Sequence, residues 1–187
     1  KKTLVTNNNL TYALDHLIQQ KCLGMDTETY GLGINDDMFS LQIASRSEAF
    51  YFNFHNYEDG TYVWEREELL GEMDGLLSNK ATTWFVHNAK FDLHRFANVG
   101  FDISGRIHCT QAIERLIYNQ HVQYSLDSCL KRRGKSKNDE VKAYIKEHKL
   151  YERVSIEGKK RKQRNDFYWK VPFDIMFEYG CDDADDV

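Results

Sequence analysis

Two carboxylates spaced two residues apart, in the run Met25-Asp26-Thr27-Glu28-Thr29, place the strongest restriction on how this chain can fold. Apolar residues precede the run and glycines follow it, so we predict a strand that ends near Gly31. Because side chains two apart on a strand share a face, Asp26 and Glu28 project side by side. Their charges repel each other, and a cation bound between them would remove that repulsion. Taken alone, the run also fits an exposed acidic strand end.

Strand-like runs come first in the chain and strand–helix alternation follows, which predicts a mixed α/β fold. We predict a five-stranded sheet flanked by helices. Its strands are residues 23–29, 39–44, 49–54, 82–86 and 106–109, and a shorter strand-like run, 3–5, is not counted among them. Predicted helices are residues 10–20, 67–77, 87–98, 111–119 and 173–187, with a short helix from 125 and weak helical periodicity over 141–150.

The length of 187 residues, 41% of them hydrophobic, indicates one globular domain over residues 1–187. No apolar run approaches membrane-span length, and the start of the chain lacks a signal-peptide pattern. The four cysteines are scattered without a CxxC pair. This favours a reduced, intracellular protein, cytoplasmic if bacterial or phage-encoded, and argues against zinc. Since the chain starts at Lys1 rather than at a methionine, we expect it to be part of something longer.

Basic residues gather late in the chain, in a segment that we define as the basic insertion (residues 134–170). Between Lys131 and Arg164 there are fourteen Lys or Arg against five Asp or Glu, a local charge of +9, while the whole chain carries −4. This polarity suggests that one part of the molecule grips a polyanion while carboxylates elsewhere bind metal. A solvated insertion whose lysines merely keep it soluble is the alternative.

Two further motifs supply acidic side chains at helical spacing. Asn88 and Asp92 are four apart at the start of a predicted helix that follows a strand, where open α/β folds place ligands. Tyr179 and Asp183 are four apart on the predicted last helix. The first pair alone would be a helix cap and the second a solvated chain end. Together with the carboxylate pair on the strand, they predict one acidic site.

The order Asp-x-Glu, Asn-x-x-x-Asp, Tyr-x-x-x-Asp resembles the three exonuclease motifs of the DEDD superfamily, in its tyrosine-bearing subclass. The strings that carry the resemblance are Met25-Asp26-Thr27-Glu28-Thr29, Val86-His87-Asn88-Ala89-Lys90-Phe91-Asp92 and Tyr179-Gly180-Cys181-Asp182-Asp183-Ala184-Asp185. They are most similar to the 3′–5′ proofreading domain of family A, bacterial DNA polymerase I-like or phage DNA polymerases. The resemblance implies a ribonuclease H-like fold, hydrolysis of nucleotides from DNA 3′ ends, and a polymerase domain beyond Val187.

The same resemblance implies the roles of the acidic residues. The metal-binding carboxylates would be Asp26, Glu28, Asp92 and Asp183, holding two divalent cations, with Asp26 bridging them. Hard oxygen ligands favour Mg²⁺ or Mn²⁺ over zinc. Tyr179 would orient the attacking water, since a phenol with an ordinary pKa of about 10 is a poor general base.

Nucleic-acid contacts are also implied. Leu32 would wedge against the terminal base, Thr29 would touch the terminal nucleotide, and Asn88 and Phe91 would hold the unpaired end, although Phe91 also suits ordinary packing. Within the basic insertion, we predict phosphate contacts from Lys159, Lys160, Arg161 and Lys162. The chain departs from the family at Cys109-Thr110, where Asp-Thr is common.

Two other functions remain open from the sequence. A 3′–5′ exoribonuclease of the ribonuclease D type carries the same tyrosine motif. A catalytically inactive domain kept as a DNA-binding scaffold would usually have lost carboxylates, and here all four are present.

Overall fold

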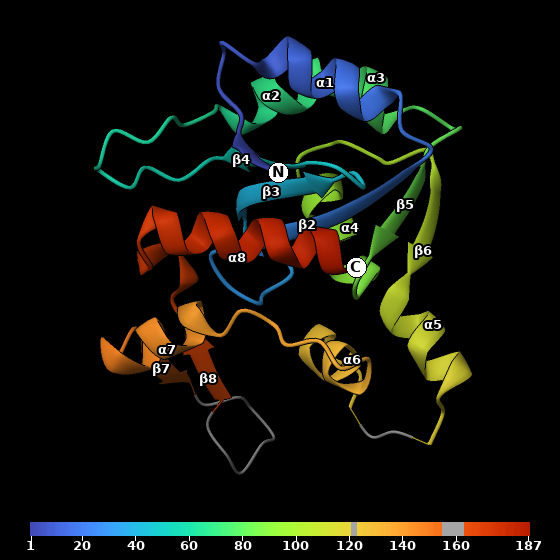
Figure 1. Cartoon of the computed structure of the whole chain (residues 1–187). Helices are drawn as coiled ribbons and strands as arrows, with labels where there is room; N and C mark the ends of the chain where they lie inside the picture. Colours follow the sequence, from blue (N-terminus) through green and yellow to red (C-terminus); the bar gives the residue numbers. More distant parts are fainter. Residues whose placement is uncertain (121–122, 155–162) are drawn as a thin grey trace.

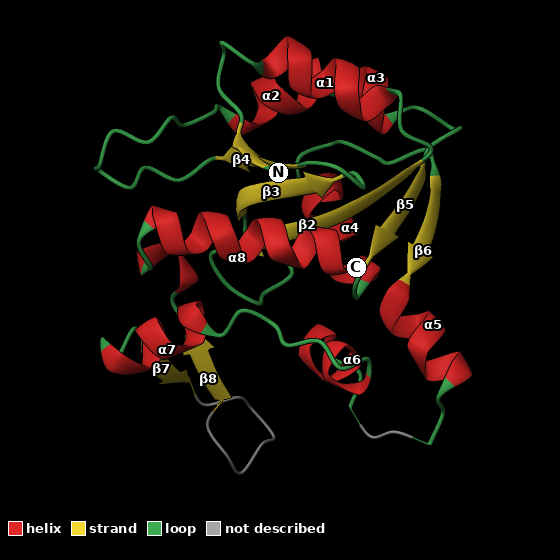
Figure 2. Ribbon diagram, in the orientation of Figure 1, coloured by secondary structure: helices red, strands yellow, loops and turns green. Residues whose placement is uncertain are grey.

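The computed structural model describes residues 1–120, 123–154 and 163–187. Figures 1 and 2 show a mixed sheet with helices on both of its faces. The strands are β1 (Lys2–Leu4), β2 (Cys22–Thr29), β3 (Met38–Ala44), β4 (Ala49–Asn53), β5 (Thr83–Val86), β6 (Arg106–Cys109), β7 (Tyr151–Val154) and β8 (Gln163–Asp166). The helices are α1 (Leu10–Ile18), α2 (Arg66–Glu72), α3 (Asp74–Leu77), α4 (Ala89–Asn98), α5 (Thr110–Ile117), α6 (Leu126–Arg132), α7 (Glu140–Glu147), α8 (Phe173–Asp186) and a 3₁₀ turn, η1 (Tyr168–Lys170).

The main sheet has six strands in the order β1-β4-β3-β2-β5-β6. β2 pairs antiparallel with β3 on one side and parallel with β5 on the other, so it runs through the middle of the sheet. The predicted mixed α/β architecture is confirmed, with one strand more than the five predicted. The extra strand is β1, which pairs parallel with β4 at the edge. Three residues on an edge carry too short a pattern to be counted as part of a sheet.

The two faces of the sheet are covered differently. α1, α2, α3 and α4 enclose the larger core with alternate residues of β2, including Leu23 and Met25. On the other face, α8 lies across the sheet (Figure 1) and packs Cys181 and Ala184 against Tyr51 of β4. Because the odd-numbered residues of β2 are committed to the core, its even-numbered residues face α8.

The approach of α8 to β2 depends on a glycine. A Cβ atom at Gly24 would lie 2.0 Å from the backbone oxygen of Ala184, a separation that no side chain can adopt. A residue without a side chain at this position therefore lets the backbone of α8 rest directly on β2. This contact sets the distance between α8 and β2, the strand that carries Asp26 and Glu28.

Several predicted boundaries were wrong. The predicted helix 67–77 is interrupted at Met73, which separates α2 from α3. In the basic insertion, the helix ends earlier than predicted, and the chain continues into the unpredicted hairpin β7–β8 and η1. The hairpin was missed because its strands are highly polar and have no apolar alternation. In the described part of the chain, the helices are too short or too polar to cross a membrane.

Candidate active site

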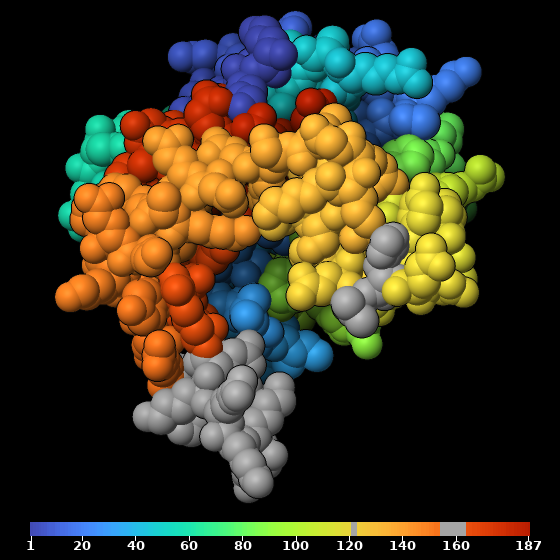
Figure 3. All heavy atoms as spheres, turned by 60° about the horizontal axis from the view of Figure 1, so that its bottom comes forward, coloured from blue at the N-terminus to red at the C-terminus, as the bar shows by residue number. Residues whose placement is uncertain are grey.

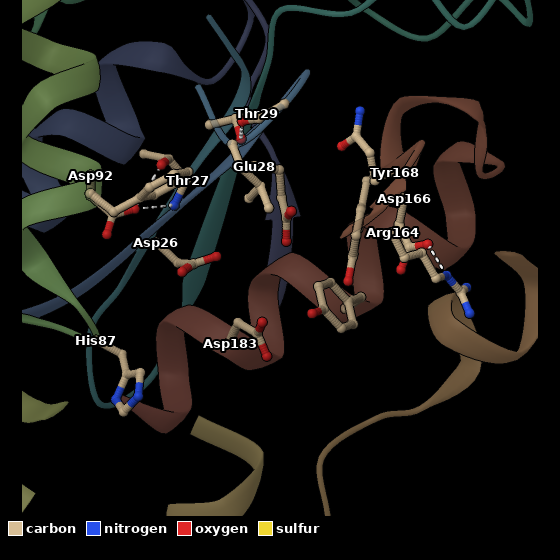
Figure 4. A pocket seen from close by; sticks show the side chains of 15 residues that line it. Asp26, Thr27, Glu28, Thr29, His87, Asp92, Arg164, Asp166, Tyr168 and Asp183 are labelled. Carbon is tan, nitrogen blue, oxygen red and sulfur yellow. Dashed lines mark hydrogen bonds and ion pairs between the residues drawn. The ribbon is translucent and has the colours of Figure 1, made fainter. Parts of the chain in front are cut away.

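A cavity opens where β2, α4, the β7–β8 hairpin and α8 meet (Figure 4). Figure 3 shows it as a hollow in one face of the molecule, with blue and green atoms of the N-terminal half between the yellow and orange residues of the C-terminal half. The predicted residues that line it are Asp26, Glu28, Thr29, Leu32, Phe91, Asp92, Tyr179 and Asp183. Elements from both ends of the chain therefore contribute to one site.

Three carboxylates converge at the base of this cavity. Asp26 and Glu28 project from β2, as their spacing predicts, and Asp183 projects from α8 toward them (Figure 4). One carboxylate oxygen from each lies within 4.8 Å of the others, so a single cation can contact all three.

The charges of Asp26 and Glu28 are poorly compensated. Loss of hydration raises the pKa of Glu28 to about 8, with further repulsion from Asp183. The same causes raise the pKa of Asp26 well above its ordinary value. Oδ1 of Asp183 is buried and has no hydrogen-bond partner within the described ranges. A buried carboxylate oxygen without a donor, beside two other carboxylates, fits a hard divalent cation.

Asp92 lies on the wall of the cavity, in the first turn of α4, and is 2% exposed. Its Oδ1 accepts hydrogen bonds from Oγ1 of Thr27 at 2.7 Å and from the backbone N–H of Thr27 at 3.2 Å. Burial raises the pKa of Asp92 to about 7, against the lowering effect of these bonds. Its oxygens are outside the group of three that lie within 4.8 Å of one another. Metal binding by Asp92 therefore stays a prediction.

Asn88 is placed differently from the prediction. It adopts a left-handed conformation, with φ 61°, so α4 begins at Ala89, two residues after the predicted start of the helix at residue 87. The side chain of Asn88 is exposed, makes no capping hydrogen bond and does not line the cavity. The predicted helical turn shared by Asn88 and Asp92 was wrong, because the chain must bend sharply between β5 and the helix.

Tyr179 is buried beside the acidic cluster, and burial raises its pKa well above the ordinary value. It therefore stays protonated at neutral pH. Its hydroxyl oxygen accepts a 2.8 Å hydrogen bond from Nζ of Lys137. The same ammonium donates to Oδ2 of Asp183 at 2.5 Å. Sequence reasoning missed Lys137, because it is one of fourteen basic residues in its region.

Part of the rim of the cavity comes from the Leu32 loop (residues 31–37), of which Gly31 and Leu32 line the cavity. Leu32 is 64% exposed at this rim. Nη1 of Arg95, from α4, donates to the carbonyl oxygens of Gly33 at 2.8 Å, Ile34 at 3.1 Å and Asp36 at 2.5 Å. The buried Arg95 thus holds the loop, a role that its sequence context gave no reason to assign.

Another part of the wall comes from the basic insertion. Arg164, Asp166 and Tyr168 line the cavity from β8 and η1 (Figure 4). The guanidinium of Arg164 lies 4.2 Å from the ring centre of Tyr151 and donates from Nε to Asp166. The predicted phosphate contacts lie outside the described residues: Lys159, Lys160, Arg161 and Lys162.

Comparison with known proteins supports the predicted chemistry. A family model described as "3′–5′ exonuclease" matches residues 2–186. Among solved structures, Brucella melitensis NrnC superposes with a TM-score of 0.58 at 20% identity, over 98% of this chain and 73% of that one. Trypanosoma brucei RNase D in complex with GMP has a TM-score of 0.71 at 14% identity, over 100% and 54%. Escherichia coli RNase D, an exoribonuclease, has a TM-score of 0.65 at 14% identity, over 100% and 42%.

These matches confirm the ribonuclease H-like fold of the DEDD exonucleases, and one of the NrnC structures contains bound Mg²⁺. A comparison with curated proteins gives no match. The neighbours described above are NrnC and RNase D rather than DNA polymerases, so the predicted polymerase context stays a prediction.

Proposed function

The chain belongs to the 3′–5′ exonuclease family, and we propose that it removes nucleotides from the 3′ end of a single nucleic-acid strand, with RNA as the first substrate to consider. The observation that carries this proposal is the convergence of Asp26, Glu28 and Asp183 within 4.8 Å, beside the protonated Tyr179. Phosphodiester hydrolysis requires negative charge on the phosphate to be neutralised and a water molecule to be aligned with the phosphorus.

The acidic side chains account for the first requirement. Asp26, Glu28 and Asp183 would hold divalent cations, assisted by Asp92, and the bound cations would acidify the water and stabilise the departing 3′ oxygen. Because these side chains are carboxylates rather than thiols or imidazoles, Mg²⁺ or Mn²⁺ suits the site.

Tyr179 and the rim meet the second requirement. The Tyr179 hydroxyl stays protonated and can donate a hydrogen bond to the water, which orients a lone pair toward the phosphorus. Leu32 and Phe91 offer apolar surface to the terminal base, and such surface accepts bases of any identity. Contributions to the wall of the cavity from both the Leu32 loop and β8 favour one strand over a duplex.

Two substrates are candidates. Two of the structural neighbours are RNase D, and one is described as an exoribonuclease, which favours RNA. The three motif strings resemble those of the proofreading domains of DNA polymerases, which favours DNA. A scaffold without activity would bind a strand and leave it intact.

Single-stranded RNA and DNA of one sequence, labelled at the 5′ end, test the proposal in Mg²⁺, in Mn²⁺ and in EDTA. We expect a ladder of products shortened from the 3′ end in either metal and no products in EDTA. The Asp26→Ala/Glu28→Ala double variant is the control for a contaminating nuclease. Binding without cleavage by the wild-type protein would refute the exonuclease proposal and favour the scaffold. The ratio of kcat/KM values for the two strands identifies the preferred sugar.

A further inference from the structure

Among the described cations of the basic insertion, Lys137 stands apart because its ammonium is turned inward. Its side chain is 10% exposed, whereas the side chain of Lys135, two residues earlier, is 63% exposed and pairs with Asp186. Its ammonium contacts the Tyr179 hydroxyl and the Asp183 carboxylate. The burial of a lysine is costly unless its charge is paired, and here Asp183 pairs it.

The packing of α7 against α8 sets the position of Lys137. This lysine lies between α6 and α7, and α7 is anchored against α8 by Val141 and Ile145, which contact the cluster containing Met176 and Tyr179. Figure 1 shows α6 and α7 on the same side of α8, with the connecting segment passing beneath it. The position of Lys137 is thus set by a small apolar core of the basic insertion.

The hydrogen bond from Lys137 limits the directions in which the Tyr179 hydroxyl can donate its own hydrogen. A phenol oxygen has one hydrogen to donate and lone pairs that accept. Nζ of Lys137 donates to this oxygen at 2.8 Å and also lies 4.4 Å from the centre of the ring. With a lone pair occupied by the ammonium, the hydroxyl hydrogen is directed away from Lys137.

We propose that Lys137 is a positioning residue of the exonuclease reaction, which acts through Tyr179 by orienting its hydroxyl as a donor toward the attacking water. The inference rests on the proposed function, since the reaction assigns a role to Tyr179. A purely structural lysine would stabilise α8 without coupling to the hydroxyl of Tyr179. A lysine that only holds Asp183 would affect metal binding instead.

A double-mutant cycle separates these roles. Lys137→Met, Tyr179→Phe and the double variant are assayed on the preferred single strand, with kcat and KM measured separately. We expect Lys137→Met to lower kcat by at least about tenfold with KM changed by less than about threefold. In the Tyr179→Phe background, the same substitution should lower kcat by less than about twofold, because the hydroxyl that it orients is absent. Equal losses in both backgrounds, or an unchanged kcat, would overturn the inference.

Two controls address α8 and the metal site. Lys2→Met removes ion pairs to Glu178 at 2.6 Å and to Asp182 at 2.7 Å on the same helix, so it should leave kcat within about twofold. Calorimetric titration with Mn²⁺ in the absence of substrate should show the same stoichiometry for Lys137→Met as for wild type. Loss of Mn²⁺ binding would overturn the inference, because the lysine would then act through Asp183.

Folding is checked by circular dichroism. If Lys137→Met does not fold, Lys137→Leu, which also lacks a donor, replaces it in the cycle with the same expectations. Lys137→Arg keeps a charged donor and should recover at least about a third of the wild-type kcat, and a kcat as low as that of the neutral variant would overturn the inference. A wild-type protein without nuclease activity would overturn the proposed function itself, whereas an active wild type with an equally active Lys137→Met overturns the inference alone.

Discussion

Raising the pH should destabilise the metal-free protein, because carboxyl groups that are protonated in the folded state must ionise inside the cavity. The pKa of Glu28 is about 8 in the folded protein, against an ordinary value of 4.5, and that of Asp92 is about 7, against 3.8. With the folded pKa above the unfolded one, the folded protein binds the proton more tightly. The stabilisation is complete below the unfolded pKa and is lost as the pH rises to the folded one.

The expected fall in the free energy of unfolding can be calculated for the change from pH 6 to pH 9. This interval includes two pH units below the pKa of Glu28 and one below that of Asp92. At 1.36 kcal/mol for each unit, the free energy of unfolding falls by about 2.7 kcal/mol for Glu28 and about 1.4 kcal/mol for Asp92. For a domain of this size, a total of about 4 kcal/mol lowers Tm by about 8–16 °C.

Thermal unfolding at pH 6 and pH 9, in EDTA and in 10 mM Mg²⁺, measures this effect. Mg²⁺ compensates the ionised carboxylates, so its stabilising effect on Tm should be larger at pH 9 than at pH 6. Glu28→Gln replaces the acid by a neutral amide and should reduce the fall in Tm by more than half. If the protein in EDTA has the same Tm at both pH values, or if Glu28→Gln shows the full fall, the acidic cluster does not hold its protons as described here.

Three substitutions test the framework around the site. Arg95→Met removes the donor to three carbonyl oxygens of the Leu32 loop. It should therefore raise KM by about tenfold and lower the free energy of unfolding by about 2 kcal/mol. An unchanged KM in steady-state assays would contradict this role of Arg95. Leu32→Ala shortens an exposed side chain, so it should raise KM about threefold and leave Tm within about 1 °C of the wild-type value. A large fall in Tm would show that Leu32 is a core residue. Gly24→Ala places a Cβ 2.0 Å from the Ala184 oxygen. We therefore expect the free energy of unfolding, measured in urea, to fall by more than about 2 kcal/mol and most of the activity to be lost. A stable, active variant would refute the close contact.

The part of the site that could be predicted depends on short-range periodicity. The spacing of two between Asp26 and Glu28 is sufficient to place them on one face of a strand, and the spacing of four between Tyr179 and Asp183 does the same on a helix. Both placements hold in the structure. The fold class followed from the order of the strand and helix patterns, since each pattern reflects local burial.

The part that could not be predicted depends on contacts between segments distant in sequence. Lys137 reaches Tyr179 and Asp183 because α7 docks on α8, and no local pattern distinguishes it from the other lysines of the basic insertion. Arg95 faces the Leu32 loop through a tertiary contact of the same kind. Asn88 was misplaced because the spacing of four to Asp92 was interpreted as one helical turn, although asparagine is among the residues other than glycine that most often adopt the left-handed conformation.

The packing of α8 directly against β2 has a consequence for synthesis and refolding. The two halves of the acidic cluster come from the second strand and the final helix, so no fragment that lacks either one can contain a complete site. A partly synthesised or partly folded chain without a docked α8 would therefore lack the complete set of three carboxylates. The appearance of nuclease activity during refolding would report the docking of the last helix rather than the earlier formation of the sheet.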